Sequence, residues 1–186
     1  MEKETFISKE SLIYFLSLKS EKKIHSLFKK ANALAKKLYK NIVYFRGIVE
    51  ISNICEKNCF YCGLRKDQKI KRYTMTKNQI INCAKFCYQN NFGSILLQSG
   101  EVITHQRIEF LIDIIKTIKK KYNLGITLSL GELSKESLKE LFKSGAHRYL
   151  LRIETSNQKL YNKIHPKDHS FKNRLKTLEY LKSIVI

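Results

Sequence analysis

The chain has 186 residues, of which 43% are apolar, 11% aromatic and 28% charged. This composition indicates a globular protein with enough apolar side chains for one core, and it excludes disorder as the main state. One proline and seven glycines exclude collagen-like and low-complexity sequences. No apolar run reaches the roughly 18 residues of a membrane span, and the polar start MEKETF lacks the pattern of a secretory signal. We therefore expect a cytoplasmic protein without a membrane anchor.

The net charge of +20 arises from 36 basic and 16 acidic residues. Lysine supplies 29 of the basic residues and arginine only 7, whereas nucleic-acid-binding proteins rely strongly on arginine. The lysines are dispersed along the chain, which indicates a solvated basic surface. This pattern argues against a nucleic-acid partner and favours an ordinary solvated surface, with attraction of an acidic partner, such as a small electron carrier, as the functional alternative.

Two helices are predicted within residues 8–40, where apolar residues recur at helical spacing. The spacing then changes, because residues 46–52 are short and β-branched, as expected of a strand. We interpret residues 1–44 as a helical extension and residues 45–186 as the main domain.

The rest of the chain alternates between strands and helices. A cysteine-rich loop follows the first strand, and Thr76 is expected to cap a helix that ends near Asn90. Further strands are predicted at 93–98, 125–130 and 147–153, with helices at 105–121 and 134–144 between them and helical segments after them. Gly145 suits the end of the second of these helices. Connections of this kind indicate an α/β fold with a parallel sheet.

Three of these strands are followed by a glutamate, namely Glu101, Glu132 and Glu154. Ligands bind at the carboxyl edge of parallel sheets. One such glutamate could simply start a helix, but three at the same edge predict a polar site there.

The cysteines Cys55, Cys59 and Cys62 have the spacing C-x3-C-x2-C. An odd count of five cysteines argues against a disulfide framework. Structural zinc requires four ligands, and the nearest histidines, His25 and His105, are far away in the sequence. Three thiolates suit a 4Fe-4S cluster with one open iron. A zinc knuckle or chance clustering is the alternative.

This cysteine motif, with Tyr61 before its last cysteine, resembles that of radical S-adenosylmethionine (SAM) enzymes. The wider sequence resembles the FeFe-hydrogenase maturase HydE family, with methylornithine synthase close and biotin synthase more distant. The segments that carry this resemblance are 46–53, 97–101, 127–132, 148–155 and 173–174.

The resemblance implies the cofactors and their contacts. Cys55, Cys59 and Cys62 would bind three irons of a 4Fe-4S cluster, and SAM would chelate the fourth for reductive cleavage. The residues that match cofactor-binding positions are Tyr61 near the adenine, Ser99, Gly100 and Glu101 near the methionyl ammonium, Glu154, and Arg174 near the methionyl carboxylate. Thr127 and Ser129 match the strand that lines the substrate pocket.

Each assignment has an ordinary structural alternative. Glu154 could pair with Arg152, Arg174 could be a surface charge, and Thr127 and Ser129 could be strand residues with satisfied hydroxyls. Agreement with one family pattern favours the functional roles of Glu154 and Arg174. It does not decide whether Thr127 and Ser129 contact the substrate.

Two further cysteines, Cys83 and Cys87, are four residues apart on a predicted helix. We expect them to be small residues of its packed face, with a second metal site as the alternative.

A complete (β/α)8 barrel needs about 250 residues. We therefore expect a partial TIM-type barrel of about four parallel strands, whose second half is absent. A fragment of a longer product, an inactive remnant, and a half completed by another chain all remain open.

The function predicted from the resemblance is that of a radical SAM enzyme in assembly of the hydrogenase active site, the H-cluster. The implied partners are a small-molecule or iron-complex substrate, an acidic electron donor of the flavodoxin or ferredoxin type, and other hydrogenase maturation proteins. The alternatives are a methylornithine synthase, which is a lysine mutase, a biotin-synthase-like enzyme, an inactive fragment, and a basic nucleic-acid module with zinc-binding cysteines.

Overall fold

The structure is a computed structural model that describes residues 7–184. The chain divides into two compact units, Met1–Val43 and Tyr44–Ile186. The division lies one residue before the boundary expected from the sequence.

The first unit contains the two predicted helices, α1 (Lys9–Leu16) and α2 (Glu21–Tyr39). The hydroxyl of Ser8 caps α1 by accepting a hydrogen bond from the backbone N–H of Ser11 at 3.1 Å. Neither helix buries a side chain in the described part of this unit.

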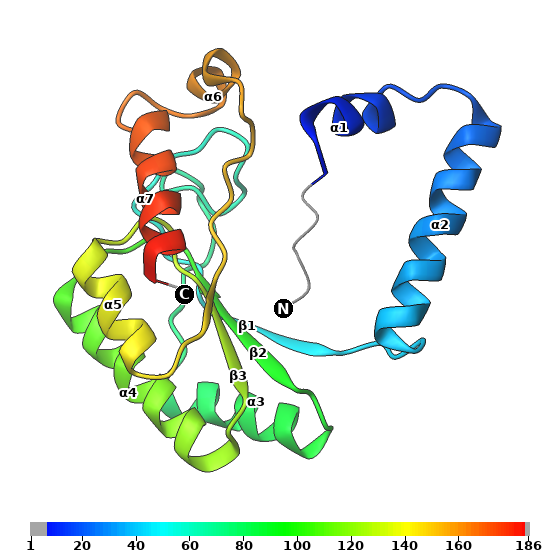
Figure 1. Cartoon of the computed structure of the whole chain (residues 1–186). Coiled ribbons are helices and arrows are strands. Elements are labelled where there is room, and N and C mark those ends of the chain that lie inside the picture. Colours follow the sequence, from blue (N-terminus) through cyan, green and yellow to red (C-terminus); the bar gives the residue numbers. More distant parts are fainter. Residues whose placement is uncertain (1–6, 185–186) are drawn as a thin grey trace. The chain divides into compact units, whose positions relative to one another are not determined.

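The second unit is built on a parallel sheet with the strand order β1-β2-β3-β4 (Figure 1). The strands are β1 (Arg46–Ser52), β2 (Ser94–Ser99), β3 (Gly125–Ser129) and β4 (Arg148–Tyr149). The predicted α/β class and the partial barrel with four parallel strands are confirmed.

The fourth strand is shorter than the sequence indicates. Residues 147–153 were expected to pair, but the ladder contains only Arg148 and Tyr149. One further bond, from Leu150 N to Leu128 O at 2.8 Å, follows the ladder. The strand ends early because its partner β3 ends at Ser129, which lies opposite position 150 in this register, so that residues 151–153 have no strand beside them in the described structure.

Helices α3 (Lys77–Gln89), α4 (His105–Tyr122) and α5 (Lys135–Lys143) pack on one face of the sheet and enclose the apolar core (Figure 1). Helix α3 begins after Thr76 as predicted, in a capping box with Gln79. Gly145 ends α5 with a φ of +119°, a conformation that favours glycine.

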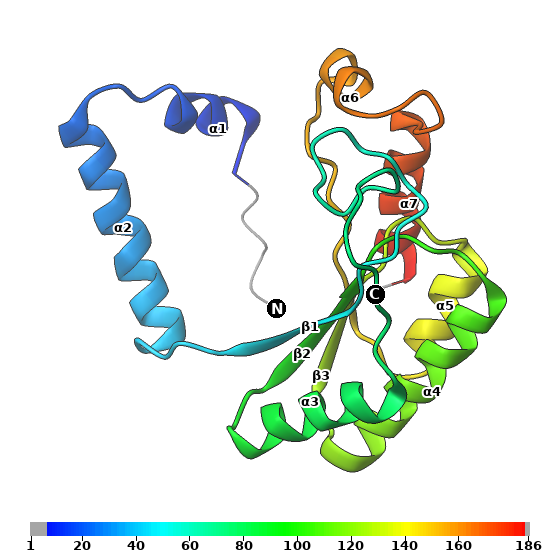
Figure 2. The same ribbon diagram turned by 180° about the vertical axis from the view of Figure 1, so that it is seen from behind.

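The remaining elements lie beyond the carboxyl ends of the strands. These are the loop of residues 53–73, α6 (Gln158–Ile164) and the start of α7 (Phe171–Ile184), which Figures 1 and 2 show near one another. Helix α7 also packs on α5 and contributes the buried Leu181 to the core.

A bulge marks the end of β1. Glu50 pairs with Gln98 and Ser52 with Ser99, so that Ile51 is an extra residue in β1. The bulge directs Ser52 to the start of the loop, where its hydroxyl donates to Tyr73 O at 2.9 Å and accepts from Ile54 N at 3.2 Å.

Within residues 7–184, no helix combines the length and the apolar character needed to cross a bilayer.

Candidate cluster and cofactor site

The carboxyl ends of the strands border a cavity of about 420 Å³. The residues predicted from the sequence that line it are Cys55, Cys59, Tyr61, Cys62, Ser99, Gly100, Glu101, Ser129, Glu154 and Arg174. They come from segments more than one hundred residues apart in the chain. The fold therefore brings together what the sequence shows only as separate motifs.

Thr127 is the predicted site residue that does not line this cavity. It lies on the same face of β3 as Ser129 but one layer deeper, paired with Leu96 and Arg148. Its side chain is 3% exposed, and its hydroxyl has no hydrogen-bond partner among the described residues. It borders a separate hollow with Arg46 and Arg148. The geometry gives no support to its predicted contact with substrate.

The three thiols of the cysteine motif are free and half-buried. Burial raises the pKa of the Cys59 thiol, and the neighbouring Cys62 and Cys55 raise it further. Within residues 7–184, no three potential ligands converge on the position of a single metal ion. An iron–sulfur cluster spaces its ligands more widely than one ion does, because each thiolate binds a different iron atom.

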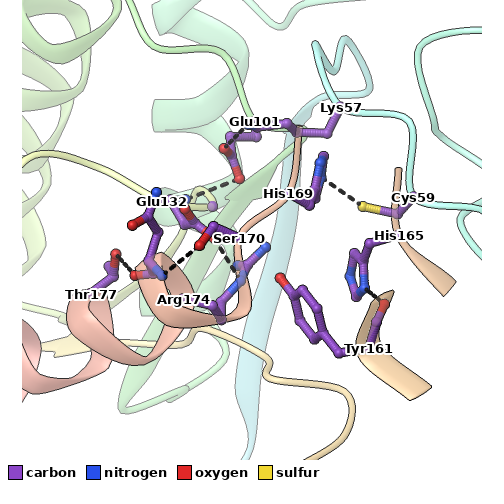
Figure 3. Close-up of polar contacts among 12 residues, drawn as sticks. Lys57, Cys59, Glu101, Glu132, Tyr161, His165, His169, Ser170, Arg174 and Thr177 are labelled. Carbon is purple, nitrogen blue, oxygen red and sulfur yellow. Dashed lines mark hydrogen bonds and ion pairs between the residues drawn. The ribbon is translucent and has the colours of Figure 1, made fainter. Parts of the chain in front are cut away.

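Two histidines contact the cysteine loop, and the sequence analysis missed both. They lie in the connection between α6 and α7 (Figure 3). His169 Nε2 is 3.3 Å from Cys59 Sγ, and His165 Nε2 is 3.0 Å from the Tyr61 hydroxyl. Phe60 N also donates to Ile164 O at 3.0 Å. These contacts join the loop to the last third of the chain.

The partners of His165 define its proton positions. Its Nδ1 lies 2.9 Å from the carbonyl oxygen of Tyr161, which can only accept, so Nδ1 carries a hydrogen. Burial lowers the pKa of His165 and keeps the ring neutral. Its Nε2 therefore accepts from Tyr61, whose own pKa burial raises. This hydrogen bond orients the phenol ring at the cavity wall.

Glu101 is a buried carboxylate at the end of β2, with 6% of its surface exposed. Its Oε2 accepts from Glu132 N at 3.0 Å, and its Oε1 lies 3.5 Å from Nζ of Lys57 (Figure 3). Oε1 accepts no hydrogen bond from the described residues. A buried oxygen without a donor is costly. Glu101 thus has an oxygen that accepts no hydrogen bond from the described residues, is paired at 3.5 Å with the Lys57 ammonium, and has the charge that attracts a further cationic group in the cavity.

Two glycines make room for this arrangement. A Cβ at Gly131, whose φ is +84°, would overlap the carboxylate of Glu101. A Cβ at Gly100 would overlap the carbonyl oxygen of Ile54 and lie 2.7 Å from the Cβ of Cys55. Both positions require glycine because another chain segment occupies the space that a side chain needs.

Arg174 lies at the start of α7 and is 7% exposed. Its Nε is 2.8 Å from Oε1 of Glu132 (Figure 3). Burial by itself lowers the pKa of Arg174, but the nearby Tyr161 hydroxyl and Glu132 carboxylate outweigh it and raise the pKa. Arg174 is therefore a buried cation at the cavity wall, and the surface-charge alternative is wrong.

Glu154 is exposed and also lines the cavity. Its φ of +63° places it in the left-handed region, which is uncommon for a residue other than glycine. Such strained positions concentrate at functional sites. Glu154 forms no ion pair with Arg152 in the described structure, in contrast to the alternative considered from the sequence.

The residues present fit an iron–sulfur cluster and an amino-acid-bearing cofactor. Three half-buried thiols share one cavity, and the same cavity holds a buried carboxylate, one oxygen of which accepts no hydrogen bond from the described residues, and a buried guanidinium. A carboxylate suits an ammonium group and a guanidinium suits a carboxylate.

Comparison with known proteins identifies the family. Residues 49–186 match the Radical SAM superfamily. The chain belongs to the radical SAM superfamily. Members of this superfamily use a 4Fe-4S cluster and SAM.

The FeFe-hydrogenase maturase subunit HydE of Thermotoga maritima is 42% identical to the chain over 178 residues, which are 95% of this chain and 50% of that protein. The 3-methylornithine synthase of Methanosarcina acetivorans is 26% identical over 177 residues, again 95% and 50% of the two chains. The chain thus spans about half the length of the curated relatives it matches.

Solved radical SAM structures share the fold. The crystal structure of methylornithine synthase has a TM-score of 0.83, and that of HydG, a maturase of the FeFe-hydrogenase, has 0.85. Both are 23% identical to this chain and cover 95% of it, which is 52% and 41% of those proteins. At this identity the likeness shows the fold alone.

Proposed function

We propose that this chain forms the cluster-binding and SAM-binding part of an enzyme that acts in FeFe-hydrogenase maturation. The observation that carries the proposal is the cavity in which three thiols meet the buried carboxylate of Glu101 and the guanidinium of Arg174. The 42% identity to HydE favours maturation as the pathway.

In this proposal, Cys55, Cys59 and Cys62 hold the three ligated irons of the 4Fe-4S cluster. When bound, the cluster supplies the electron that cleaves SAM reductively. Tyr61 packs near the adenine, oriented by its hydrogen bond to His165.

The remaining cavity residues orient the methionyl end of SAM. Glu101, with Ser99 and Gly100 beside it, accepts from the ammonium group, and Arg174 binds the carboxylate. Glu132 holds Arg174 in place through their 2.8 Å ion pair. Glu154 lines the same cavity and is a further contact for SAM in this proposal.

In this proposal the substrate binds beside Ser129 at the carboxyl end of β3. Ser129 lines the cavity together with Glu50 and Gln98, whose side chains are hydrogen-bonded to each other at 2.7 Å. Such polar groups suit a small molecule or an iron complex with polar ligands.

The surface charge bears on the protein partners. The net charge of +20 favours an acidic electron donor of the flavodoxin or ferredoxin type. Other hydrogenase maturation proteins would receive the product. Five free thiols suit the reducing cytoplasm.

Lysine rearrangement is the second candidate, because the chain also resembles 3-methylornithine synthase. The lower identity of 26% makes it second to maturation. Product analysis after incubation with lysine separates the two reactions.

The test is anaerobic reconstitution with iron and sulfide, followed by incubation with SAM and a strong reductant. We expect about four iron atoms per chain and formation of 5′-deoxyadenosine. Cys55→Ala, Cys59→Ala and Cys62→Ala should each lose both. Cys83→Ala is the matched control, because Cys83 is a half-buried cysteine of α3 outside the cavity.

Two results would contradict the proposal. Bound zinc in place of iron would favour the metal-binding module, above all with salt-sensitive RNA binding. A complete cluster without SAM cleavage would show that the chain lacks the activity.

A further inference from the structure

The cysteine loop has little regular structure to keep it in shape. Residues 53–73 contain no helix or strand, yet three thiols within them must stand at fixed distances for one cluster. Hydrogen bonds connect the loop instead, and one side chain donates five of them. The Arg72 guanidinium donates to five backbone carbonyl groups, those of Asn53, Leu64, Arg65, Lys66 and Gln68.

The accepting carbonyl groups lie on both sides of the cysteines. Nη1 of Arg72 reaches Asn53 O at 2.6 Å, before the first cysteine, and Leu64 O at 2.9 Å, after the last. Nη2 reaches Arg65 O at 2.7 Å, Lys66 O at 3.2 Å and Gln68 O at 3.1 Å. One group therefore closes the loop across the three thiols.

The side chain of Asn53 fixes the other end of this network. Its Nδ2 donates to Lys71 O at 2.8 Å, and its Oδ1 accepts from Tyr73 N at 2.8 Å. These bonds hold the two neighbours of Arg72 in place. Asn53 is 7% exposed, so the hydrogen-bond network includes a buried residue directly after β1.

Only arginine has the geometry for this arrangement. Its planar guanidinium presents five N–H donors in a fixed fork, whereas lysine has three donors around a single nitrogen. Arg72 does not line the cavity, so it acts through the backbone and touches neither the cofactor nor the thiols.

We propose that Arg72 is a positioning residue, which holds Cys55, Cys59 and Cys62 at the spacing that cluster assembly requires. The part of this inference that concerns cluster assembly rests on the proposed function. The ordering of the loop by Arg72 does not depend on it.

The experiment compares the full-length Arg72→Lys variant with the wild type and with Arg65→Lys. Arg65 is the matched control, because it lies in the same loop and its side chain donates to one backbone carbonyl, that of Phe60, besides the side-chain amide of Gln68. Hydrogen exchange of the metal-free protein is followed in peptides from the loop and from α4. Iron and sulfide are measured after reconstitution.

We expect Arg72→Lys to increase exchange of the hydrogen-bonded loop amides at least tenfold, among them Cys62 and Lys66, and to leave α4 unchanged. Cluster content should fall below half of the wild-type value. Arg65→Lys should match the wild type in both measurements.

Every other outcome is also decisive. Unchanged loop exchange, or a loosened loop with full cluster content, overturns the role of Arg72. Faster exchange in α4 as well shows a general folding role and overturns it too. If the wild type takes up no cluster while loop protection still depends on Arg72, the proposed function fails and the ordering of the loop stands.

Discussion

Replacing Glu101 with glutamine tests the cofactor site most directly, because it keeps the shape and removes the charge. The amide oxygen can still accept from Glu132 N, as Oε2 does now at 3.0 Å. The NH2 group then occupies the place of Oε1, 3.5 Å from Lys57 Nζ, where it cannot accept from an ammonium group. A hydrogen bond to a charged group contributes about 1.5–3 kcal/mol. We therefore expect SAM to bind about 10- to 150-fold more weakly.

The assay is calorimetric titration of SAM into the reconstituted, unreduced protein, together with thermal unfolding. The control is Glu136→Gln, at an exposed position in the first turn of α5. A dissociation constant for Glu101→Gln within twofold of the wild type would refute the assignment. An equal loss in Glu136→Gln would show that the effect comes from the overall charge.

Two further substitutions test the close packing at Gly131 and the effect of His147 protonation on stability. Gly131→Ala places a Cβ against the carboxylate of Glu101 at a φ of +84°, so we expect about 1–3 kcal/mol lower stability in denaturant unfolding. Gly93→Ala, where the Cβ meets nothing within 4 Å, should match the wild type, and equal losses would contradict the reasoning. Partial desolvation and the neighbouring Arg148 lower the pKa of the exposed His147, whose Nδ1 accepts from Ile126 N at 3.0 Å. The contribution of His147 to stability is therefore complete above about pH 6.5 and declines as the pH falls below that value. The difference in the free energy of unfolding between the wild type and His147→Gln should therefore become smaller as the pH falls from 7.5 to 5.5. A difference that stays constant over this range would contradict the role of neutral His147 in stability.

The order of elements in the second unit could be predicted because local signals agree with the final fold. Thr76 caps α3 and Gly145 ends α5, as their residue types indicate. The length of β4 could not be predicted, because the apolar run after Arg148 does not show where the partner strand β3 ends. Pairing, which the local sequence does not encode, decides where an edge strand ends.

The candidate site was predictable where strand ends and a spaced motif mark it, as at Glu101 and the three cysteines. Thr127 and Ser129 are two residues apart and lie on the same face of β3, so the sequence pattern does not distinguish them. They differ in their distance from the carboxyl end of the strand, which becomes apparent only in the folded sheet. His169 and Arg72 act through partners that the sequence does not reveal, a thiol 110 positions away and five carbonyl groups. The one sequence signal that pointed to His169 is the second histidine four residues before it, at position 165.

The contact between Cys59 and His169 has a consequence for biosynthesis. The cysteine leaves the ribosome 110 residues ahead of its histidine neighbour, and Tyr61 precedes His165 by 104 residues. During translation the nascent thiols therefore stay without these partners until α6 and the start of α7 have emerged. The cysteine loop therefore acquires all its described contacts only after the last third of the chain has been synthesised and has folded against it.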